Sequence, residues 1–216
     1  VIAPSAAILP EILHEYGYGT FAVGKWHLAT LEDCSPAGPM DHWPLQRGFD
    51  RYYGFMGGAT DQFSPELTVD NHPIDPPSHE GYHVSEDIVD QAIAMITAHQ
   101  GSAPGNRFFT YVAFGATHSP HQAPASYVEK YKGRYDEGWD VIRARWFEEQ
   151  LATGIVPQGT QLSPRNPGVE PWDELSNDKK ALYARMQEVF AAFLDHTDDQ
   201  IGRLLDFIES IDQLDD

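Results

Sequence analysis

The sequence predicts an α/β fold in which helices flank a mostly parallel central sheet. Two short runs, residues 21–23 and 107–115, are almost continuously apolar, which is typical of strands buried on both faces of a parallel sheet. Between and after them, apolar residues recur at steps of three and four, as in amphipathic helices. Polar residues follow both runs directly, and α/β sheets form their sites at the carboxyl ends of strands.

The first third of the chain predicts a helix, a strand and then a long irregular span. Residues 8–16 are expected to form a short helix, with Pro10 in its first turn and Gly17 after its end. Residues 20–27 are expected to form a strand that ends at a lysine–histidine pair. Prolines and glycines are frequent from residue 29 onward, and a long irregular span in a compact domain usually lines a site. We therefore predict a loop-rich active-site insertion at about residues 29–83.

The remainder predicts one further strand and several helices. Residues 84–99 form an amphipathic helix with Ser85 as its N-cap and Ile88, Ala92 and Ile96 facing inward. The strand at 107–115 follows. Helices are then expected at residues 125–132 and 137–152, a Pro/Gly/Asn loop at about 154–172, and a mostly helical segment at 176–214 that allows a break near Thr197. The inward positions predicted for this last segment are Leu182, Met186, Val189, Phe193, Ile201, Leu204, Ile208 and Ile211.

The charge of the chain restricts its partners. The 216 residues carry a formal net charge of −19. This acidity excludes nucleic acid and anionic membranes as expected partners, because binding them needs lysine and arginine, and it disfavours polyanionic substrates. A small anion can still be held by a few local cations. No run approaches the ~20 apolar residues of a membrane span.

The single cysteine, Cys34, excludes an intrachain disulfide, and no Asn-x-Ser/Thr acceptor occurs. Both observations favour a reducing compartment, so we expect a cytoplasmic location. The chain begins at Val1 without an initiator methionine, and we expect it to be an excerpt of a longer protein. A periplasmic location therefore stays open as the alternative.

Lys25 and His27 are the first candidate site residues. Side chains two apart in an extended segment point to the same face, so both can converge on one point while Trp26 turns away. The lysine keeps the neighbouring imidazole neutral, and a neutral imidazole can act as a general base. An ammonium within about 4 Å of an anion contributes roughly 4 kcal/mol at an effective dielectric near 20. The spacing alone leaves a lysine and a histidine without a functional role equally open.

His118 and His121 follow the second apolar run. A His-x-x-His pair could supply two metal ligands, but the intervening Pro120 argues against the regular helix that would align them. We therefore predict no metal site in this chain. Cys34 lies in a loop without a base at a fixed offset, and we interpret it as an incidental thiol.

With these residues identified, the chain resembles the sulfatase family of the alkaline-phosphatase-like superfamily. The stretches GYGTFAVGKWHL, WPLQRGFDRYYGFMGG and FFTYVAFGATHSPHQAP are similar to successive sulfatase motifs, in the family's order. The segments YKGRYDEGWDVIRARWFEEQLATGIVPQGTQLSP and HTDDQIGRLLDFIE are similar to the bacterial arylsulfatase branch in particular. The resemblance implies an alkaline-phosphatase-like sandwich, incomplete in this excerpt, with residues 1–216 as the central part of the catalytic domain.

The resemblance also implies roles for three residues. Lys25 would contact both the sulfate and the nucleophile. His27 would hydrogen-bond the nucleophile's hydroxyl and help to break the sulfoenzyme intermediate, and His118 would bind a sulfate oxygen and assist the departing alcohol. His121 receives no role.

Two features of the family are absent from the sequence. The formylglycine nucleophile arises from a Cys-x-Pro-x-Arg motif upstream of the GKWH stretch; Cys34 begins Cys-Ser-Pro-Ala-Gly and lies downstream of it. The family's calcium ligands come from an Asp-Asp near the N-terminus and an Asp-Asn expected just beyond residue 216, and neither of these two pairs is present in this excerpt. We therefore expect nucleophile and calcium to come from other segments of the parent protein, and this excerpt alone to be inactive.

The function implied by the resemblance is hydrolysis of small aryl or alkyl sulfate esters. Two alternatives remain: a phosphonate monoester or phosphodiester hydrolase of the same superfamily, and a non-catalytic module that docks with other segments of the parent protein.

Overall fold

The computed structural model describes residues 1–214, which form two compact units. The first unit consists of residues 1–124 together with the residues from Phe193 onward, and the second is Ala125–Ala192. Helix α5 (Asn177–Ser210) contributes to both units. Each unit has its own core.

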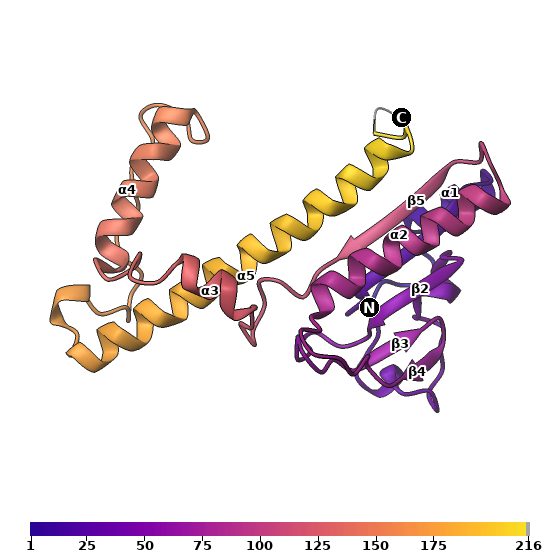
Figure 1. Ribbon diagram of the computed structural model, residues 1–216, viewed down its shortest axis with the longest axis horizontal. Coiled ribbons are helices and arrows are strands. Elements are labelled where there is room, and N and C mark those ends of the chain that lie inside the picture. Colours follow the sequence, from indigo (N-terminus) through magenta and orange to yellow (C-terminus); the bar gives the residue numbers. More distant parts are fainter. Residues whose placement is uncertain (215–216) are drawn as a thin grey trace. The chain divides into compact units, whose positions relative to one another are not determined.

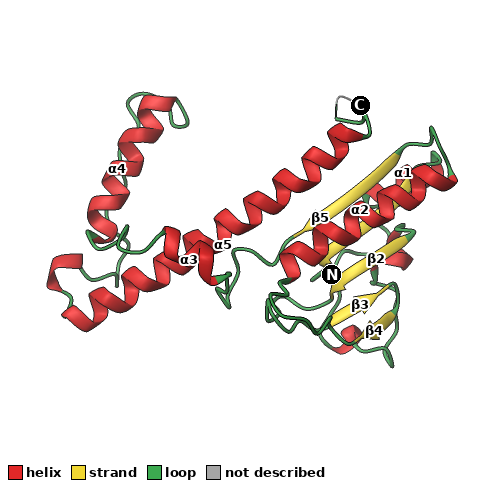
Figure 2. Ribbon diagram, viewed as in Figure 1, coloured by secondary structure: helices red, strands yellow, loops and turns green. Residues whose placement is uncertain are grey.

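The first unit is built on a five-stranded sheet with the order β4-β3-β2-β1-β5 (Figures 1 and 2). Strand β1 (Gly19–Lys25) pairs in parallel with both β2 (Arg51–Phe55) and β5 (Phe108–Ala113). Strands β3 (Leu67–Val69) and β4 (His72–Ile74) add an antiparallel hairpin beside β2. The predicted α/β fold with a mostly parallel sheet is confirmed.

A glycine row allows the three parallel strands to approach closely. In the pairing register, Gly24 lies opposite Gly54 on one side and Ala113 on the other. A Cβ atom at Gly24 would overlap the Ala113 carbonyl oxygen, and a Cβ atom at Gly54 would overlap the Gly24 carbonyl oxygen. Gly24 also has φ +97°, a conformation that side chains disfavour. Only glycine fits at these two positions.

One face of the sheet packs against α2 (Val84–Ser102) and the second half of α5. The predicted inward residues Ile88, Ala92 and Ile96 are fully buried here. The predicted N-cap is wrong: the cap is His83, whose Nδ1 accepts the Ser85 N–H at 3.2 Å. Ser85 therefore lies inside the first turn.

The opposite face packs against residues of the predicted loop-rich span. The Trp26 and Trp43 rings are buried there, and Trp26 Nε1 donates to the His42 carbonyl at 2.7 Å. Trp43 Nε1 donates to the Asp33 carbonyl at 2.6 Å. These bonds hold the chain around residues 31–43 against the sheet. The span also contains β2, β3, β4 and 3-10 turns at Glu32–Cys34 and Pro44–Arg47.

Helix α1 (Leu9–Glu15) is fixed by a buried arginine. The Arg47 Nε donates to Glu11 Oε1 at 2.6 Å, and its two terminal nitrogens donate to the carbonyls of Ile2 and Ala6. A guanidinium with several partners tolerates burial that a single bond would not offset. The helix begins with Pro10 in its first turn, and Gly17 follows it at φ +80°, as predicted.

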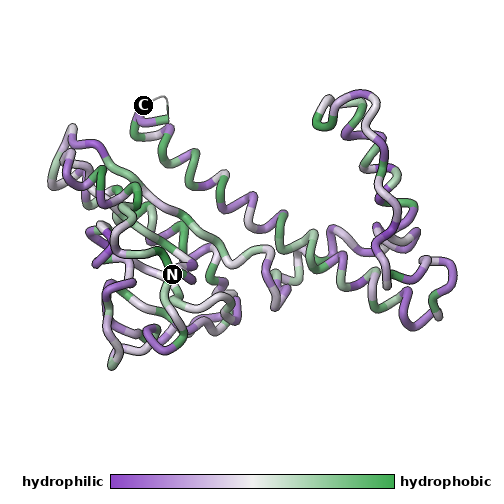
Figure 3. The backbone as a smooth tube through the Cα atoms, turned by 180° about the vertical axis from the view of Figure 1, so that it is seen from behind, coloured by the Kyte–Doolittle hydropathy of each residue, from purple (hydrophilic) through white to green (hydrophobic). Residues whose placement is uncertain are grey.

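Helix α5 differs from its prediction in two respects. It runs without a break through Thr197, whose hydroxyl donates to the Phe193 carbonyl at 2.9 Å instead of ending the helix. Leu182, Met186 and Ile201, predicted to face inward, are exposed. Smaller and polar residues occupy buried positions instead, among them Ala184, Glu188, Ala192, His196 and Gln200. In Figure 3 green and purple alternate along this helix.

The second unit consists of short helices around an aromatic core. It contains α3 (Ala125–Lys130), α4 (Gly138–Thr153) and a 3-10 turn at Trp172–Glu174, besides the first part of α5. Both predicted helices and the irregular segment between α4 and the turn are confirmed. The Gly133 N–H donates to the buried Glu188 at 2.7 Å, which ties the loop after α3 to α5.

Strand β5 forms one edge of the sheet, and its residues are half-buried or, at Tyr111, exposed, so the predicted burial on both faces is wrong. Among residues 1–214 it pairs with β1 alone, so one row of its backbone groups has no strand partner. An edge strand of this kind is a template for pairing with further strands.

Replacing Gly24 by alanine should destabilise the protein. A side chain at φ +97° that also overlaps the Ala113 carbonyl should cost more than about 2 kcal/mol, which lowers Tm by roughly 5 °C in a domain of this size. Calorimetry on the full-length protein measures the shift. Gly101→Ala is the matched control, because Gly101 lies in α2 with open space around it, so its Tm should stay constant or rise. Equal Tm values for both variants would contradict the close approach.

Candidate active site

Lys25 is the last residue of β1 and lies between β2 and β5 at the carboxyl edge of the sheet. Its pairing partner on β2 is Phe55. The side chain is half-buried, and within residues 1–214 its ammonium forms no ion pair and no hydrogen bond. The chain has 33 acidic residues, so an unneutralised lysine at this edge is available for an external anion.

His27 follows the strand and is exposed. The N–H groups of Trp26 and His27 donate to the carbonyls of Phe55 and Met56, at 3.0 and 3.1 Å. The predicted extended backbone through His27 is wrong: the strand ends at Lys25, and His27 has φ 51°. Its ring lies against Gly58, where an added Cβ would be 2.8 Å from Cε1 and Nε2. Contact with Gly58, and not strand alternation, therefore locates this imidazole.

His118 lies in the loop after β5 and is exposed. Its N–H donates to the Gly115 carbonyl at 2.9 Å, and its Nδ1 lies 2.6 Å from the Ser119 carbonyl oxygen. A carbonyl oxygen can only accept, so Nδ1 carries a proton and Nε2 is left for an external group. The His118 Nε2 is therefore the ring nitrogen that can interact with an external group.

The sheet brings the three predicted residues to one edge. Strands β1 and β5 are parallel neighbours with Gly24 opposite Ala113, so both chains leave the sheet at the same end. Lys25 and His27 stand at the end of β1, and His118 lies in the loop that follows β5. This is the carboxyl edge, where α/β folds collect functional groups.

The predictions missed a polar cluster beneath this edge. Gln62 is buried and lies against Gly115, and its backbone N–H donates to the Gln122 side chain at 2.7 Å. The two glutamines are 60 residues apart, and no local pattern in the sequence pairs them. They connect the loop before β3 with the loop that carries His118.

Two histidines are buried next to this cluster. The rings of His83 and His196 meet at 4.4 Å between centroids, and His196 Nε2 lies 2.9 Å from Glu86 Oε1. Burial lowers the pKa of His83 to about 4, with His196 as a second cause. The Gln122 carbonyl and the carboxylates of Glu86 and Asp61 oppose this shift. His83 is therefore neutral at physiological pH.

Neither a metal site nor a nucleophile is found among residues 1–214. No group of three or more His, Cys, Asp or Glu side chains in this part is arranged to hold a metal ion, so these residues do not fit calcium. The Cys34 Sγ donates to the Thr30 carbonyl at 3.1 Å. Burial, with Asp33 and Glu32 nearby, raises the pKa of Cys34, which is the opposite of an activated thiolate.

A cavity of about 650 Å³ lies at the carboxyl end of β2, and Lys25, His27 and His118 are not among its lining residues. Met56 and Gly57 line it next to the Gly58 that contacts His27. Its other walls are mainly apolar, and its charged lining residues, Glu66 and Asp75, are acidic. The cavity therefore suits an uncharged organic group better than a second anion.

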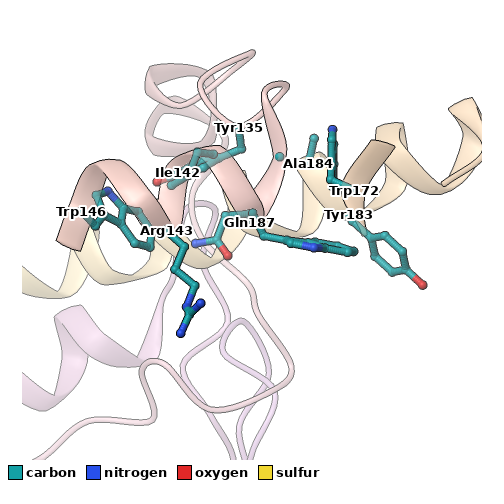
Figure 4. A pocket seen from close by; sticks show the side chains of 10 residues that line it. Tyr135, Ile142, Arg143, Trp146, Trp172, Tyr183, Ala184 and Gln187 are labelled. Carbon is teal, nitrogen blue, oxygen red and sulfur yellow. The ribbon is translucent and has the colours of Figure 1, made fainter. Parts of the chain in front are cut away.

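The second unit contains a separate aromatic pocket of about 240 Å³, shown in Figure 4. Its walls include the rings of Trp139, Trp146, Trp172 and Tyr183, with Trp139 and Trp172 edge-to-face at 4.9 Å. Arg143 is the charged lining residue, and its guanidinium donates to both oxygens of Ser163. The pocket offers aromatic surface and no nucleophile or base, so it is not the candidate active site.

The sequence profile of the sulfatase family matches residues 2–216. The chain belongs to the sulfatase family. It is 35% identical to an uncharacterized sulfatase of Schizosaccharomyces pombe, over 97% of this chain and 39% of the relative. It is 27% identical to the arylsulfatase of Klebsiella aerogenes, over 93% of this chain and 43% of that enzyme. The chain thus spans about two fifths of the length of these relatives.

Solved structures show the same fold. Ps i-CgsB, solved in complex with k-i-k-neocarrahexaose, matches with a TM-score of 0.59 at 18% identity, over 94% of this chain and 36% of that one. The Bacteroides fragilis protein yidJ, described as a sulfatase, matches with a TM-score of 0.60 at 17% identity, over 95% and 40%. Within residues 1–214 of this sulfatase family member, every helix is too short or too polar to cross a membrane.

The buried His83 should make the stability of this sulfatase family member depend on pH. With a folded pKa of about 4 against 6.5 unfolded, the unfolded state binds more protons between these values, so stability falls as pH falls from 6.5 to 4. The full pKa shift of His83 corresponds to roughly 3 kcal/mol in the free energy of unfolding. Urea unfolding at pH 7 and pH 4.5 measures it, and His83→Gln is the control that should flatten this window. An unchanged pH slope in that variant would contradict the assignment.

Proposed function

We propose that the parent protein is a sulfuric ester hydrolase that cleaves small aryl or alkyl sulfate esters. The observation that carries the proposal is the half-buried ammonium of Lys25, which has no ion-pair or hydrogen-bond partner among residues 1–214, at the sheet edge that also carries two exposed imidazoles. Membership of the sulfatase family supports it. An edge with a cation and proton-transfer groups suits a monoanionic tetrahedral ester.

The reaction consumes one water and gives the alcohol and hydrogen sulfate, with the bond between sulfur and the bridging oxygen broken. Charge builds up on the sulfuryl oxygens and on the departing oxygen. Lys25 would hold the sulfuryl oxygens. His118, in its imidazolium form, would donate the Nε2 proton to the departing oxygen, because its Nδ1 proton is bound to Ser119. His27 would hydrogen-bond the attacking hydroxyl.

The nucleophile and the dication belong to the same proposal. We propose that a formylglycine and a calcium site of the parent protein lie in other segments, and that residues 1–216 are the central part of its catalytic domain. The described residues do not fit calcium, and Cys34 is not activated. The remaining segments of the parent are therefore the partners of this chain, and the edge of β5 that has no strand partner among residues 1–214 is a suitable place for a further strand.

The substrate class follows from charge and shape. The cavity at the carboxyl end of β2, lined by Met56 and Gly57, has mainly apolar walls and two acidic residues, which favours an uncharged organic group on the ester. The Klebsiella aerogenes relative is an arylsulfatase, which supports an aryl or alkyl group. Phosphonate monoesters and phosphodiesters are the competing substrates.

In the full-length protein, His118→Ala should lower kcat on 4-nitrophenyl sulfate by about 10²- to 10³-fold, because one transition-state donor is lost. Steady-state kinetics measure this. His72→Ala is the control, since His72 is an exposed histidine on β4. Near-normal kcat in a folded His118→Ala variant would refute the role of His118. Faster hydrolysis of a phosphonate monoester than of the sulfate by the unmodified protein would favour the competing reaction.

Gly58→Ala should impair catalysis by displacing His27. The new methyl would lie 2.8 Å from the ring, so the imidazole must move, and we expect a loss in kcat of about tenfold or more. Gly202→Ala is the control, because Gly202 lies in α5, with nothing within 4 Å of its Cβ, and does not line the cavity. The two variants are compared by kcat and Tm. Equal activities would show that the Gly58 contact does not locate His27.

A further inference from the structure

The loop that carries His118 is held at both ends by residues 61 and 62. The loop begins at Gly115, shortly after β5. Near its far end, Gln122 is hydrogen-bonded to Gln62. Between them, the bond from the His118 N–H to the Gly115 carbonyl, together with the Nδ1–Ser119 contact, orients the imidazole relative to the loop. The position of the loop itself therefore determines where the ring stands.

The far end of the loop is fixed through the Gln122 amide. Its Oε1 accepts the Gln62 backbone N–H at 2.7 Å, and its Nε2 donates to Asp61 Oδ2 at 2.7 Å. The other Asp61 oxygen accepts the N–H groups of Phe63 and Ser64, at 2.9 and 2.8 Å. The Gln122 bond and these N–H groups keep the pKa of Asp61 below its usual value. These bonds fix the orientation of the Gln122 amide, because its oxygen faces a donor and its nitrogen faces an acceptor.

The Gln122 backbone is fixed as well. Its carbonyl lies 3.2 Å from His83 Nε2. Because His83 Nδ1 accepts the Ser85 N–H, Nε2 carries the proton and donates to the Gln122 carbonyl. His83 is buried at the start of α2, so this bond ties the loop to the helix that covers the sheet.

The near end of the loop rests on the Gln62 side chain. A Cβ at Gly115 would lie 3.0 Å from Gln62 Nε2 and 3.1 Å from Oε1, so the amide lies against the Gly115 backbone. Gln62 Nε2 donates to the Thr60 carbonyl at 2.9 Å. Gln62 therefore contacts both ends of the loop: its side chain lies against Gly115, and its backbone N–H donates to Gln122.

We propose that Gln122 is a positioning residue that sets His118 through its amide bonds to Asp61 and Gln62. The inference rests on the proposed function, in which His118 protonates the departing oxygen. A loop released at Gln122 would leave the sheet and Lys25 in place and move the imidazole. The loss should then be larger for esters with poor leaving groups, which depend more on protonation of the departing oxygen.

The test exchanges donor and acceptor in the full-length protein. Gln122→Glu places a carboxylate against the Asp61 carboxylate. Asp61→Asn places an amide N–H against the Gln122 N–H. Each single variant therefore breaks the bond from Gln122 Nε2 to Asp61 Oδ2. In the double variant the new amide at position 61 donates to the new carboxylate at position 122, which still accepts the Gln62 N–H. The readouts are kcat and KM on phenyl sulfate and 4-nitrophenyl sulfate, Tm, and hydrogen exchange of the loop amides, including that of His118.

Each single variant should lose at least about tenfold in kcat on phenyl sulfate and clearly less on 4-nitrophenyl sulfate. The His118 amide should exchange faster, and the double variant should recover both properties to within about threefold. The proposal would be overturned if kcat fell equally on the two esters and in proportion to the loss in Tm. It would also be overturned if the double variant did not recover kcat and the exchange rate. If the unmodified protein hydrolyses neither sulfate, the proposed function fails by itself. Unchanged exchange in the single variants would then still refute the positioning role.

Discussion

The close approach of three parallel strands at one row of the sheet is the constraint on which the site depends. Gly24 sits between Gly54 and Ala113, and a side chain at either glycine would overlap a neighbouring carbonyl. Because the row lies one residue before Lys25, it aligns the carboxyl ends of β1, β2 and β5 where the chain turns to functional residues. The tight packing therefore supports the arrangement of the candidate site as well as stability.

Lys25 differs from three arginines of the first unit, which are paired with carboxylates. Arg47 is paired with Glu11, Arg51 with Asp70 and Arg203 with Asp90. Lys25 is half-buried and has no such partner within the described residues. Keeping a partly desolvated cation unpaired costs free energy, which is the pattern expected where an anionic ligand supplies the missing partner.

Local sequence patterns were enough to predict β1, α2, β5 and the helices of the second unit, because each has its own periodicity. They missed β2, β3 and β4, which lie among glycines and prolines and are specified by pairing with distant strands. The α2 cap was also mispredicted, because a buried histidine ring nitrogen took the role of Ser85.

The candidate site divides in the same way. Lys25 and His118 could be located at one edge of the sheet because both closely follow predicted strands, and the fold class assigns chemistry to strand ends, while their roles stay predictions. Gln62 and Gln122 could not, since their bond joins loops 60 residues apart and either glutamine alone looks like an ordinary polar loop residue. Groups that hold a site are recognised only once the fold has brought their partners together.

The net charge of −19 does not oppose anion binding at Lys25 as strongly as it suggests. At physiological ionic strength the screening length is about 8 Å, so most carboxylates act on a distant ligand only weakly. A monoanionic ester therefore experiences chiefly the groups around it, which are an ammonium and two imidazoles. A polyanion extends beyond this range and meets acidic side chains, including Glu66 and Asp75 in the adjoining cavity. In the function that we propose, local attraction and surrounding repulsion would together favour a small ester with a single negative charge.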